Sequence, residues 1–272
     1  MCKVLQVNRQ TYYNHINKAK NRHSKEEVAE DPYTNVVCNV FKESYRTYGT
    51  RRIKAELHAE GVVLSRRRIG RIMKAKGLVS CYTKAKYRPQ QLQPNEASIP
   101  NLLNREFRQE KARAVVVSDL TYIRVGKEWN YICTLLDLFN REIIGYSTGP
   151  NKDRHLVLQA FASVCGDLRE IGMFHTDRGG EFANHDLDER LETFEIARSL
   201  SAKACPHDNA VAEATFKTIK MEFVRRHTFT DLGQLNLEFQ QYVHWFNTKR
   251  RHSTLDYMTP DAYKSFVLEK NV

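Results

Sequence analysis

The residues from 112 onward place strand-like and helical patterns in an order that few folds can accommodate. Three strand-like segments come first, and helices then alternate with strands until a final helix. Short apolar runs indicate the strands, and apolar residues spaced three or four apart indicate the helices. The segments are strands at 112–123, 129–139 and 141–148, a helix at 154–169, a strand at 171–176, a helix at 186–194, a strand at 195–199 and a helix at 212–224. This order predicts an α/β domain in which helices cover both faces of a mixed five-stranded sheet.

Three acidic residues lie at informative places in this order. Asp119 lies in the first strand-like segment, and Asp177 follows the fourth. Glu213 lies on the last helix, and 35 residues separate it from Asp177. None of the three is informative by itself, and the alternative interpretation is that they occur at these positions by chance. Three carboxylates in these elements, at this spacing, favour a functional cluster.

The last helix presents Glu213 together with two lysines. One apolar stripe marks its buried face, and the stripe consists of Ala212, Phe216, Ile219 and Phe223. Glu213 lies about 100° round the helix from that stripe, because an α-helix turns once every ~3.6 residues. It shares its face with Lys217 and Lys220. One carboxylate and two ammonium groups are therefore expected to point outward together.

Phosphodiester cleavage or transfer is the chemistry that needs such a set. Neighbouring strands lie ~4.8 Å apart, so Asp119 and Asp177 on adjacent strands can ligate a common cation. Hard carboxylate oxygens favour Mg²⁺ or Mn²⁺ over Zn²⁺. Two such ions, held by Asp119, Asp177 and Glu213, could serve an in-line displacement. Lys217 and Lys220 would hold the phosphate backbone of the DNA there.

The motifs SDLTYI, HTDRGGEF, DNAVAEATFKTIK and WFNTKRRHSTLDYMTP carry a resemblance that covers essentially the whole chain. They resemble insertion-sequence transposases of the D,D(35)E type, in particular the second-reading-frame product of the IS-three family, which is similar to retroviral integrases. One departure is Val116, where that pattern leads us to expect a tryptophan.

The resemblance implies a ribonuclease-H-like sheet in which the first and fourth strands are parallel neighbours. It also implies catalysis and metal binding by Asp119, Asp177 and Glu213, and contact with DNA ends by Lys220. The family's members act as multimers on double-stranded DNA, at element ends and target. The family further implies a possible partner, an upstream-frame helix-turn-helix protein or a frameshift fusion with it.

The positive charge of the chain is concentrated in its first third. The net charge is +11, and residues 1–100 hold 20 Lys and Arg against 8 Asp and Glu, whereas 101–272 hold 23 against 24. A basic module ahead of a near-neutral one suggests DNA binding followed by catalysis. Within 35–79 the pattern predicts a small all-helical, helix-turn-helix domain whose last helix Ser65 caps. Its candidate DNA-binding residues are Arg66, Arg67, Arg68, Arg71 and Lys74. A solvated basic helix is the alternative.

These patterns divide the chain into five parts. They are an N-terminal helical segment at 1–34, the helix-turn-helix-like domain at 35–79, a linker at 80–110, the catalytic core at 111–228, and a C-terminal helix and basic tail at 229–272. The tail contains Lys249, Arg250, Arg251 and His252, which could contact DNA or form a solvated helix end. Asp137 is interpreted as part of a turn rather than as a metal ligand.

Several classes of protein are excluded or disfavoured. The six cysteines form no C-x-x-C pair, which argues against a disulfide framework or a structural zinc site. No apolar run approaches the ~18 residues of a membrane span. We therefore expect a cytoplasmic bacterial protein that associates with the nucleoid when it binds DNA. The rival function is a DNA-binding regulator with a catalytically silent core.

Overall fold

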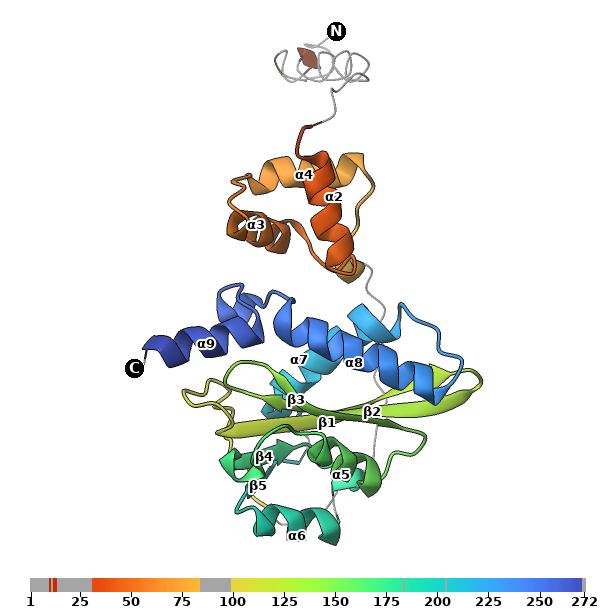
Figure 1. Cartoon of the computed structure of the whole chain (residues 1–272), viewed down its shortest axis with the longest axis vertical. Helices are drawn as coiled ribbons and strands as arrows, with labels where there is room; N and C mark the ends of the chain where they lie inside the picture. The colour runs from red at the N-terminus through yellow and green to blue at the C-terminus, as the bar shows by residue number, and fades with distance from the viewer. Residues whose placement is uncertain are drawn as a thin grey trace, which may run out of the picture.

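The structure is a computed structural model that describes residue 10, residues 12–13, 31–83, 99–182, 184–203 and 205–270. It has two parts, a small helical domain and a larger domain built on a sheet (Figure 1). Most of the predicted segment at 1–34 falls outside the described residues, as do residues 84–98 of the predicted linker. No helix among the described residues has the length and apolar character needed to cross a membrane.

The helical domain is a three-helix unit with its own core. Its helices are α2 (Thr34–Glu43), α3 (Thr50–Ala59) and α4 (Arg66–Ala75). Apolar residues from all three helices form one buried cluster, which includes Val37, Phe41, Ile53, Leu57, Ile69 and Ile72. Ser65 caps α4 as predicted, because its side chain accepts a hydrogen bond from the backbone N–H of Arg68. Gly61 and Gly77 follow α3 and α4 with positive φ, a backbone conformation that commonly ends a helix.

The sheet confirms the predicted topology. Its strands are β1 (Val115–Val125), β2 (Glu128–Asp137), β3 (Ile143–Gly149), β4 (Met173–Thr176) and β5 (Ala197–Leu200). They lie in the order β3-β2-β1-β4-β5, with β1 antiparallel to β2 and parallel to β4. This is the mixed five-stranded, ribonuclease-H-like sheet that the sequence leads us to expect, with the first and fourth strands as parallel neighbours.

Helices cover both faces of this sheet (Figure 1). One face packs on α5 (Arg154–Ala162) and α6 (His185–Thr193), and the other on α7 (Ala210–Ile219) and α8 (Leu232–Thr248). Successive residues of β1 enter opposite cores, because side chains alternate along a strand. Val115 and Val117 belong to the α7–α8 side, whereas Val116 is fully buried on the α5–α6 side. A valine thus fills the position where the resemblance leads us to expect a tryptophan.

One predicted helix is too long. The sequence pattern predicts a helix over 154–169, but α5 ends at Ala162. The chain then turns through Gly166 at a φ of +98°, and Asp167 caps a short 3-10 helix, η2 (Leu168–Glu170). The Arg113 side chain fixes this turn by donating hydrogen bonds to the carbonyl oxygens of Cys165 and Asp167. Contacts with a distant residue therefore end the helix where local spacing does not.

The helix that carries Glu213 changes its geometry at Lys220. Its buried stripe is as predicted, with Ala212, Phe216 and Ile219 in α7. Residues Lys220–Val224 form η5, a π-helical turn, instead of continuing the α-helix. Such turns are rare and occur frequently at functional sites. This turn brings Phe223 and Glu222 into the protein interior.

The two parts of the molecule meet around the buried carboxylate of Glu222. Arg250 donates from Nε and Nη2 to the two carboxylate oxygens, at 2.8 Å each. Tyr82 Oη donates at 2.6 Å and Tyr242 Oη at 3.1 Å. Arg52 of α3 lies 3.7 Å away. The helical domain, the end of the α7–η5 segment and the C-terminal region therefore share one polar contact.

The basic tail is thus part of this junction. Arg250 is 3% exposed and His252 is 7% exposed. Arg251 forms an ion pair with Glu56 of α3, with an N–O distance of 2.7 Å. For Arg250 and His252, which are buried, both interpretations of the tail, DNA contact and a solvated helix end, are wrong. Arg251 is half-buried and is paired with α3.

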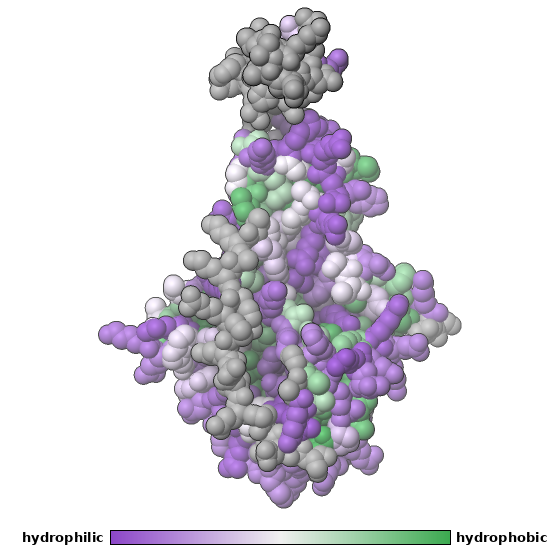
Figure 2. All heavy atoms as spheres, turned by 180° about the vertical axis from the view of Figure 1, so that it is seen from behind, coloured by the Kyte–Doolittle hydropathy of each residue, from purple (hydrophilic) through white to green (hydrophobic). Residues whose placement is uncertain are grey.

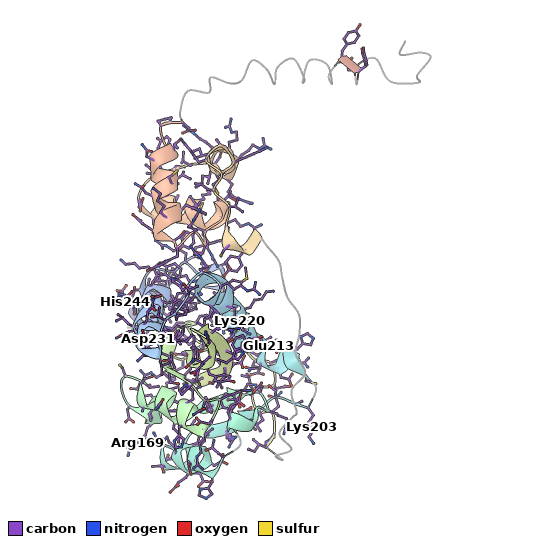
Figure 3. All side chains as sticks on the ribbon, turned by 90° about the vertical axis from the view of Figure 1, so that its right-hand side faces the viewer. Arg169, Lys203, Glu213, Lys220, Asp231 and His244 are labelled. Atoms are coloured by element: carbon purple, nitrogen blue, oxygen red, sulfur yellow. The ribbon has the colours of Figure 1, made fainter. Side chains whose placement is uncertain are left out.

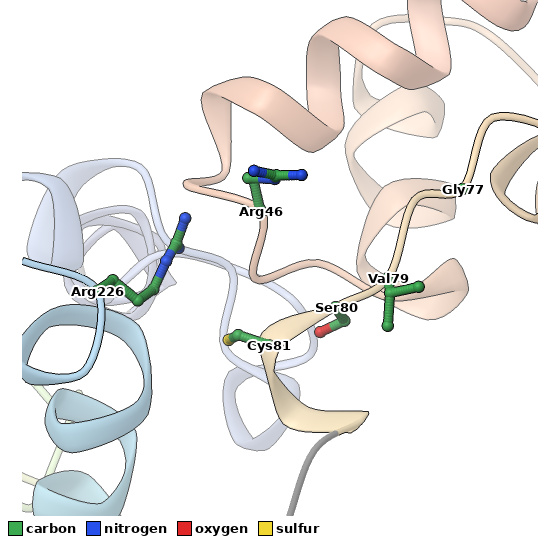
Figure 4. A pocket seen from close by; sticks show the side chains of 6 residues that line it. All are labelled: Arg46, Gly77, Val79, Ser80, Cys81 and Arg226. Atoms are coloured by element: carbon green, nitrogen blue, oxygen red, sulfur yellow. The ribbon is translucent and has the colours of Figure 1, made fainter.

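A pocket of about 420 Å³ remains beside the junction. Arg46 reaches it from the helical domain and Arg226 from the end of η5, with Cys81 between them (Figure 4). Seen from behind, hydrophilic residues dominate both parts, and apolar residues form small separate patches (Figure 2). The polar junction and this open pocket show that the two parts are not joined by one continuous apolar core.

Candidate active site

The sheet register brings Asp119 and Asp177 together. In the parallel pair of β1 and β4, Ser118 lies opposite Thr176. Asp119 and Asp177 are the next residues along the two chains. Because neighbouring strands are ~4.8 Å apart, the two carboxylates emerge side by side where β4 ends. The proximity inferred from the sequence is therefore present in the structure.

Backbone hydrogen bonds orient both carboxylates. Oδ1 of Asp119 accepts from the N–H of Leu120 at 2.7 Å. Oδ1 of Asp177 accepts from the N–H of Gly179 at 2.9 Å. In both side chains, the hydrogen bond to the backbone uses the same oxygen, Oδ1. Each aspartate is therefore held by the backbone just after it, which fixes the direction in which the pair points.

The surroundings of the pair disfavour two negative charges. Burial raises the pKa of Asp119, and the charge of Asp177 raises it further. Burial likewise raises the pKa of Asp177, while the Gly179 hydrogen bond and the charge of Lys152 oppose that shift. Two carboxylates with little compensating charge are the arrangement that a bound cation stabilises. The hard oxygen donors suit a divalent cation such as those that carboxylates commonly bind.

Glu213 is near this pair but does not join it. It lies on the exposed side of α7, and after burial the main influence raising its pKa is the charge of Asp177. Within the part of the chain that the structure describes, no three His, Cys, Asp or Glu side chains are grouped closely enough to hold a metal ion. The structure thus brings the two aspartates together and leaves Glu213 outside their ligand group.

The start of α7 is nevertheless tied to β1. Nδ2 of Asn209 donates to the carbonyl oxygen of Ser118 at 3.4 Å, directly before Asp119. The other side-chain atom of Asn209, Oδ1, is buried and makes no hydrogen bond to a described residue. The helix that carries Glu213 therefore begins next to the aspartate pair. Its carboxylate and that pair lie on the same side of the sheet domain.

The two predicted lysines differ in their surroundings. Lys217 is exposed, whereas Lys220 is half-buried at the start of η5. Burial lowers the pKa of Lys220, and the charge of Asp119 opposes that shift. Figure 3 labels Glu213 and Lys220, which come from the same continuous helical segment. The charge of Lys220 is therefore within reach of the aspartate pair, and Lys217 lies further out on the surface.

Sequence reasoning missed an ion pair beside the site. Glu181 in η3 (Gly180–Phe182) is buried, and Lys152 Nζ lies 3.1 Å from its Oε1. A Cβ atom at Gly179 would come within 2.5 Å of the same oxygen, so a larger residue here would displace the Glu181 carboxylate. The acidic residue four places after Asp177 was visible in the HTDRGGEF motif. Its partner, Lys152, lies in a different loop and has no signal in that motif.

Three other polar residues have structural roles. Asp137 accepts hydrogen bonds from the N–H groups of Arg113 and Phe139, which agrees with its interpretation as part of a turn. Arg178 donates to the carbonyl oxygens of Ser201 and Ile99. Asp208 pairs with Arg105 at 2.6 Å. The contacts of Arg178 and Asp208 join the chain around residue 100 to the core.

The candidate DNA-binding residues of α4 fall into two groups. Arg66, Arg67, Arg71 and Lys74 are exposed. Arg68 is half-buried, and its guanidinium forms an ion pair with Asp31 at 2.8 Å and lies 4.8 Å from the ring centre of Tyr33. The first group forms an exposed basic face. The Arg68 side chain instead contacts Asp31 and Tyr33 of the protein itself.

A ribonuclease-H-like sheet with paired aspartates at this position, preceded by a basic helical domain, defines a DNA-processing enzyme of the integrase type. Two family models, both described as "Integrase core domain", match residues 109–206 and 195–260, and an "HTH-like domain" model matches 30–86. The chain is 30% identical over 248 residues to the transposase for insertion sequence element IS904 of Lactococcus lactis, which covers 90% of this chain and 98% of that protein. The chain belongs to the family of IS3-type insertion-sequence transposases.

A second relative agrees with that assignment. The transposase InsF for insertion sequence IS3A of Escherichia coli is 27% identical over 272 residues, which cover 97% of this chain and 93% of that one. Among solved structures, the HTLV-2 integrase catalytic core domain in complex with magnesium matches 55% of this chain and 94% of its own, with a TM-score of 0.43 and 16% identity. The chain is a DNA transposase with an HTH-like DNA-binding domain, and the silent-regulator alternative is not favoured.

Proposed function

We propose that this chain binds the terminal inverted repeats of its own insertion sequence and catalyses cleavage and strand transfer there, with Asp119, Asp177 and Glu213 as metal ligands and catalytic residues. The observation that carries the proposal is the register of β1 and β4, which aligns the two aspartates at the end of the shared ladder. Two divalent ions, Mg²⁺ or Mn²⁺, would supply Lewis-acid activation of the phosphodiester.

The protein's own residues prepare the site. Asp119 and Asp177 are fixed by the sheet and by the backbone hydrogen bonds that orient them. Glu213 would complete the ligand set by a movement of its exposed side chain toward the pair, and α7 is anchored beside Asp119 through Asn209. A bound cation would favour that position of the side chain, because it attracts all three carboxylates.

Basic side chains would hold the DNA. Lys217 and Lys220 follow Glu213 along the same segment, where they can contact phosphates next to the cleaved bond. The exposed face of α4 supplies Arg66, Arg67, Arg71 and Lys74 for a second stretch of the duplex. Arg68 supports this face by its ion pair with Asp31.

The functional form would be a homo-oligomer assembled on the element ends, in the bacterial cytoplasm. An upstream-frame helix-turn-helix protein, or a frameshift fusion with it, is the further partner that we propose. Sedimentation of the chain with and without end DNA tests the oligomer. Translation of the complete element, followed by mass spectrometry of the products, tests the fusion.

Strand-transfer assays test the assignment of the carboxylates. The substrates are duplexes that carry the ends of the element in Mg²⁺, and the variants are Asp119→Asn, Asp177→Asn and Glu213→Gln. Each variant is expected to bind the ends as the wild type does and to lose cleavage and joining. Glu189→Gln, on the exposed side of α6, is the matched control that should keep activity. Normal joining by Asp119→Asn would remove the proposal.

A further inference from the structure

Two large aromatic side chains are exposed on the hairpin formed by β1 and β2. Tyr122 is 45% exposed and Trp129 is 53% exposed. Their rings meet edge to face, with centres 5.3 Å apart and planes at 87°. They form a corner of two rings, one on each strand. Exposed aromatic pairs are a common feature of surfaces that bind a partner.

A cation lies near each of these rings. The guanidinium carbon of Arg124 is 5.7 Å from the ring centre of Trp129, and Lys220 Nζ is 5.3 Å from that of Tyr122. Among the described residues, neither cation forms an ion pair with a carboxylate. The corner therefore combines aromatic faces with two cations that form no ion pair within the described residues. This combination suits a polyanion that has flat, stackable groups.

The corner lies round the edge of β1 from the aspartate pair. Tyr122 lies three residues after Asp119, roughly 10 Å along the strand, and because side chains alternate the two leave opposite faces of β1. Lys220 links the two places, since its charge acts on Asp119 while its ammonium lies near the Tyr122 ring. A nucleic-acid strand that has one phosphate at the aspartates and passes round this edge would place its next nucleotides at the corner.

The edge of β1 is open along this stretch. The pairing of β1 with β4 ends at Ser118, and an isolated bridge at Val125 with Phe229 is the next contact on that edge. Between these two points, the described residues pair with β1 only on the β2 side. A single strand can therefore pass this edge without displacing another part of the sheet.

We propose that Tyr122 and Trp129 form a stacking platform for an unpaired base of the DNA strand that is processed at Asp119 and Asp177. The base stacks on one ring and meets the edge of the other, while Lys220 and Arg124 bind the flanking phosphates. The inference rests on the proposed function and adds to it a site for a nucleobase. It implies that the end of the duplex opens when it binds.

Fluorescence of 2-aminopurine tests the platform without catalysis. The probe is a short duplex with a single-stranded tail that carries 2-aminopurine next to the junction, and the protein is the full chain with Asp119→Asn. Stacking on Trp129 should quench the probe. Trp129→Ala and Tyr122→Ala should reduce the quenching and weaken binding of the tailed duplex about 5- to 100-fold. Trp129→Phe and Tyr122→Phe should retain most of the affinity.

Two controls separate stacking from other effects. Phe266→Ala removes an exposed aromatic ring of α9 (Pro260–Lys270), which has a cation, Lys270, 4.3 Å from its centre. This variant should leave binding unchanged. An abasic site in place of the stacked nucleotide should make Trp129→Ala and its parent bind equally. A loss that is as large on abasic or blunt DNA would overturn the platform. So would a change of oligomeric state in Trp129→Ala with quenching unaltered, because the corner would then contact a second copy.

The failure of this inference and that of the proposed function are distinguishable. If the carboxylate assignment is wrong, strand transfer persists in Asp119→Asn, whatever the fluorescence shows. If the platform is wrong, quenching does not depend on Tyr122 and Trp129 and the abasic site does not abolish the difference between Trp129→Ala and its parent. The carboxylate variants still lose activity in that case.

Discussion

Two regions of this molecule bury acidic side chains, and they treat the negative charge in opposite ways. Glu222, at the junction of the two parts, is 1% exposed. Burial by itself raises its pKa, but Arg250 and the hydroxyl of Tyr82 outweigh that effect, and the pKa lies below its ordinary value. Within the described part of the chain, no arginine makes a bidentate contact with Asp119 or Asp177, and burial raises the pKa of both.

The difference distinguishes a structural carboxylate from one that is prepared for a ligand. Removal of a charge from water costs several kcal/mol, and an internal partner must offset that cost if the group is to stay ionised. At Glu222 the protein supplies the partner itself. At the aspartate pair the compensation is left incomplete, which is the condition under which a cation from solution binds. Both Glu222 and the aspartate pair are buried, so burial does not distinguish them. The amount of positive charge nearby does.

The largest expected effect belongs to the aspartate pair. Asp119→Asn should reduce strand transfer about 10,000-fold, because it removes a carboxylate that we propose as a ligand of the activating ions. Its free energy of unfolding should be unchanged or higher, since a crowded negative charge disappears. Gel assays of joined products and urea denaturation measure the two quantities. A large loss of stability in this variant would contradict the comparison.

The junction should show the reverse pattern, a loss of stability. Arg250→Met leaves Glu222 buried without its main partner and should destabilise the chain by about 3–5 kcal/mol. The double variant Arg250→Met with Glu222→Gln should recover part of that loss, because no unpaired charge remains. Urea denaturation of the single and double variants gives both values. Equal stability of the two would show that the charge of Glu222 is not the cause.

A divalent cation should stabilise the folded chain through the aspartate pair and not through the junction at Glu222. A divalent cation at a hundred times its dissociation constant stabilises the folded state by about 2.7 kcal/mol. Wild-type protein in Mg²⁺ should therefore have a higher Tm than in EDTA. Asp119→Asn should lose this increase, and the control Glu189→Gln should keep it. An undiminished increase in Asp119→Asn would place the cation elsewhere.

Acid should act on the junction through Glu222 and His252. The Glu222 pKa is lowered in the folded chain, so its contribution is present above its ordinary value and is lost as the pH falls through the folded value. Burial and Arg250 lower the pKa of His252, so the folded state also loses stability as the pH falls below about 6.5. Glu222→Gln should flatten the loss below the ordinary pKa of a glutamate when the free energy of unfolding is measured across pH. If the pH dependence of the free energy of unfolding were the same in Glu222→Gln as in the wild type, Glu222 would not be a cause of the acid sensitivity.

The smallest effect separates two neighbouring arginines of α4. Arg68→Ala removes a partly exposed ion pair with Asp31 and should lower the Tm only slightly, because solvent screens such pairs. Arg67→Ala should leave stability unchanged and weaken DNA binding, with the salt dependence reduced by about one phosphate contact. Thermal unfolding and DNA titration at several salt concentrations measure both. Equal behaviour of the two variants would remove the distinction between them.

Local patterns predict much of this molecule. Alternation along β1 and the stripe on α7 appear in the sequence because each buried face repeats over short distances. The aspartate pair follows once β1 and β4 are parallel neighbours, a strand order that comes from the family resemblance. The end of α5 and the π-helical turn at Lys220 do not follow, since contacts with distant residues decide them.

The junction was least accessible to sequence reasoning. Glu222 is bound by residues near positions 52, 82, 242 and 250, and no single segment contains a signal for that meeting. The tail motif TKRRH looks like an exposed basic cluster because adjacent positive charges usually lie in water. Here a buried acid from another element reverses that expectation for Arg250. Conversely, Tyr122 and Trp129 look like ordinary strand residues until the structure shows that they are exposed.

The alternation of side chains along β4 limits which mutations this part of the gene can accept. Side chains of a strand alternate between its two sides, so the loss or gain of one residue between Met173 and Thr176 would turn Asp177 toward the opposite side of the sheet. A deletion of two residues would restore the side but shift the aspartate along its neighbour. This short strand is therefore expected to tolerate substitutions but not insertions or deletions, because these would displace Asp177.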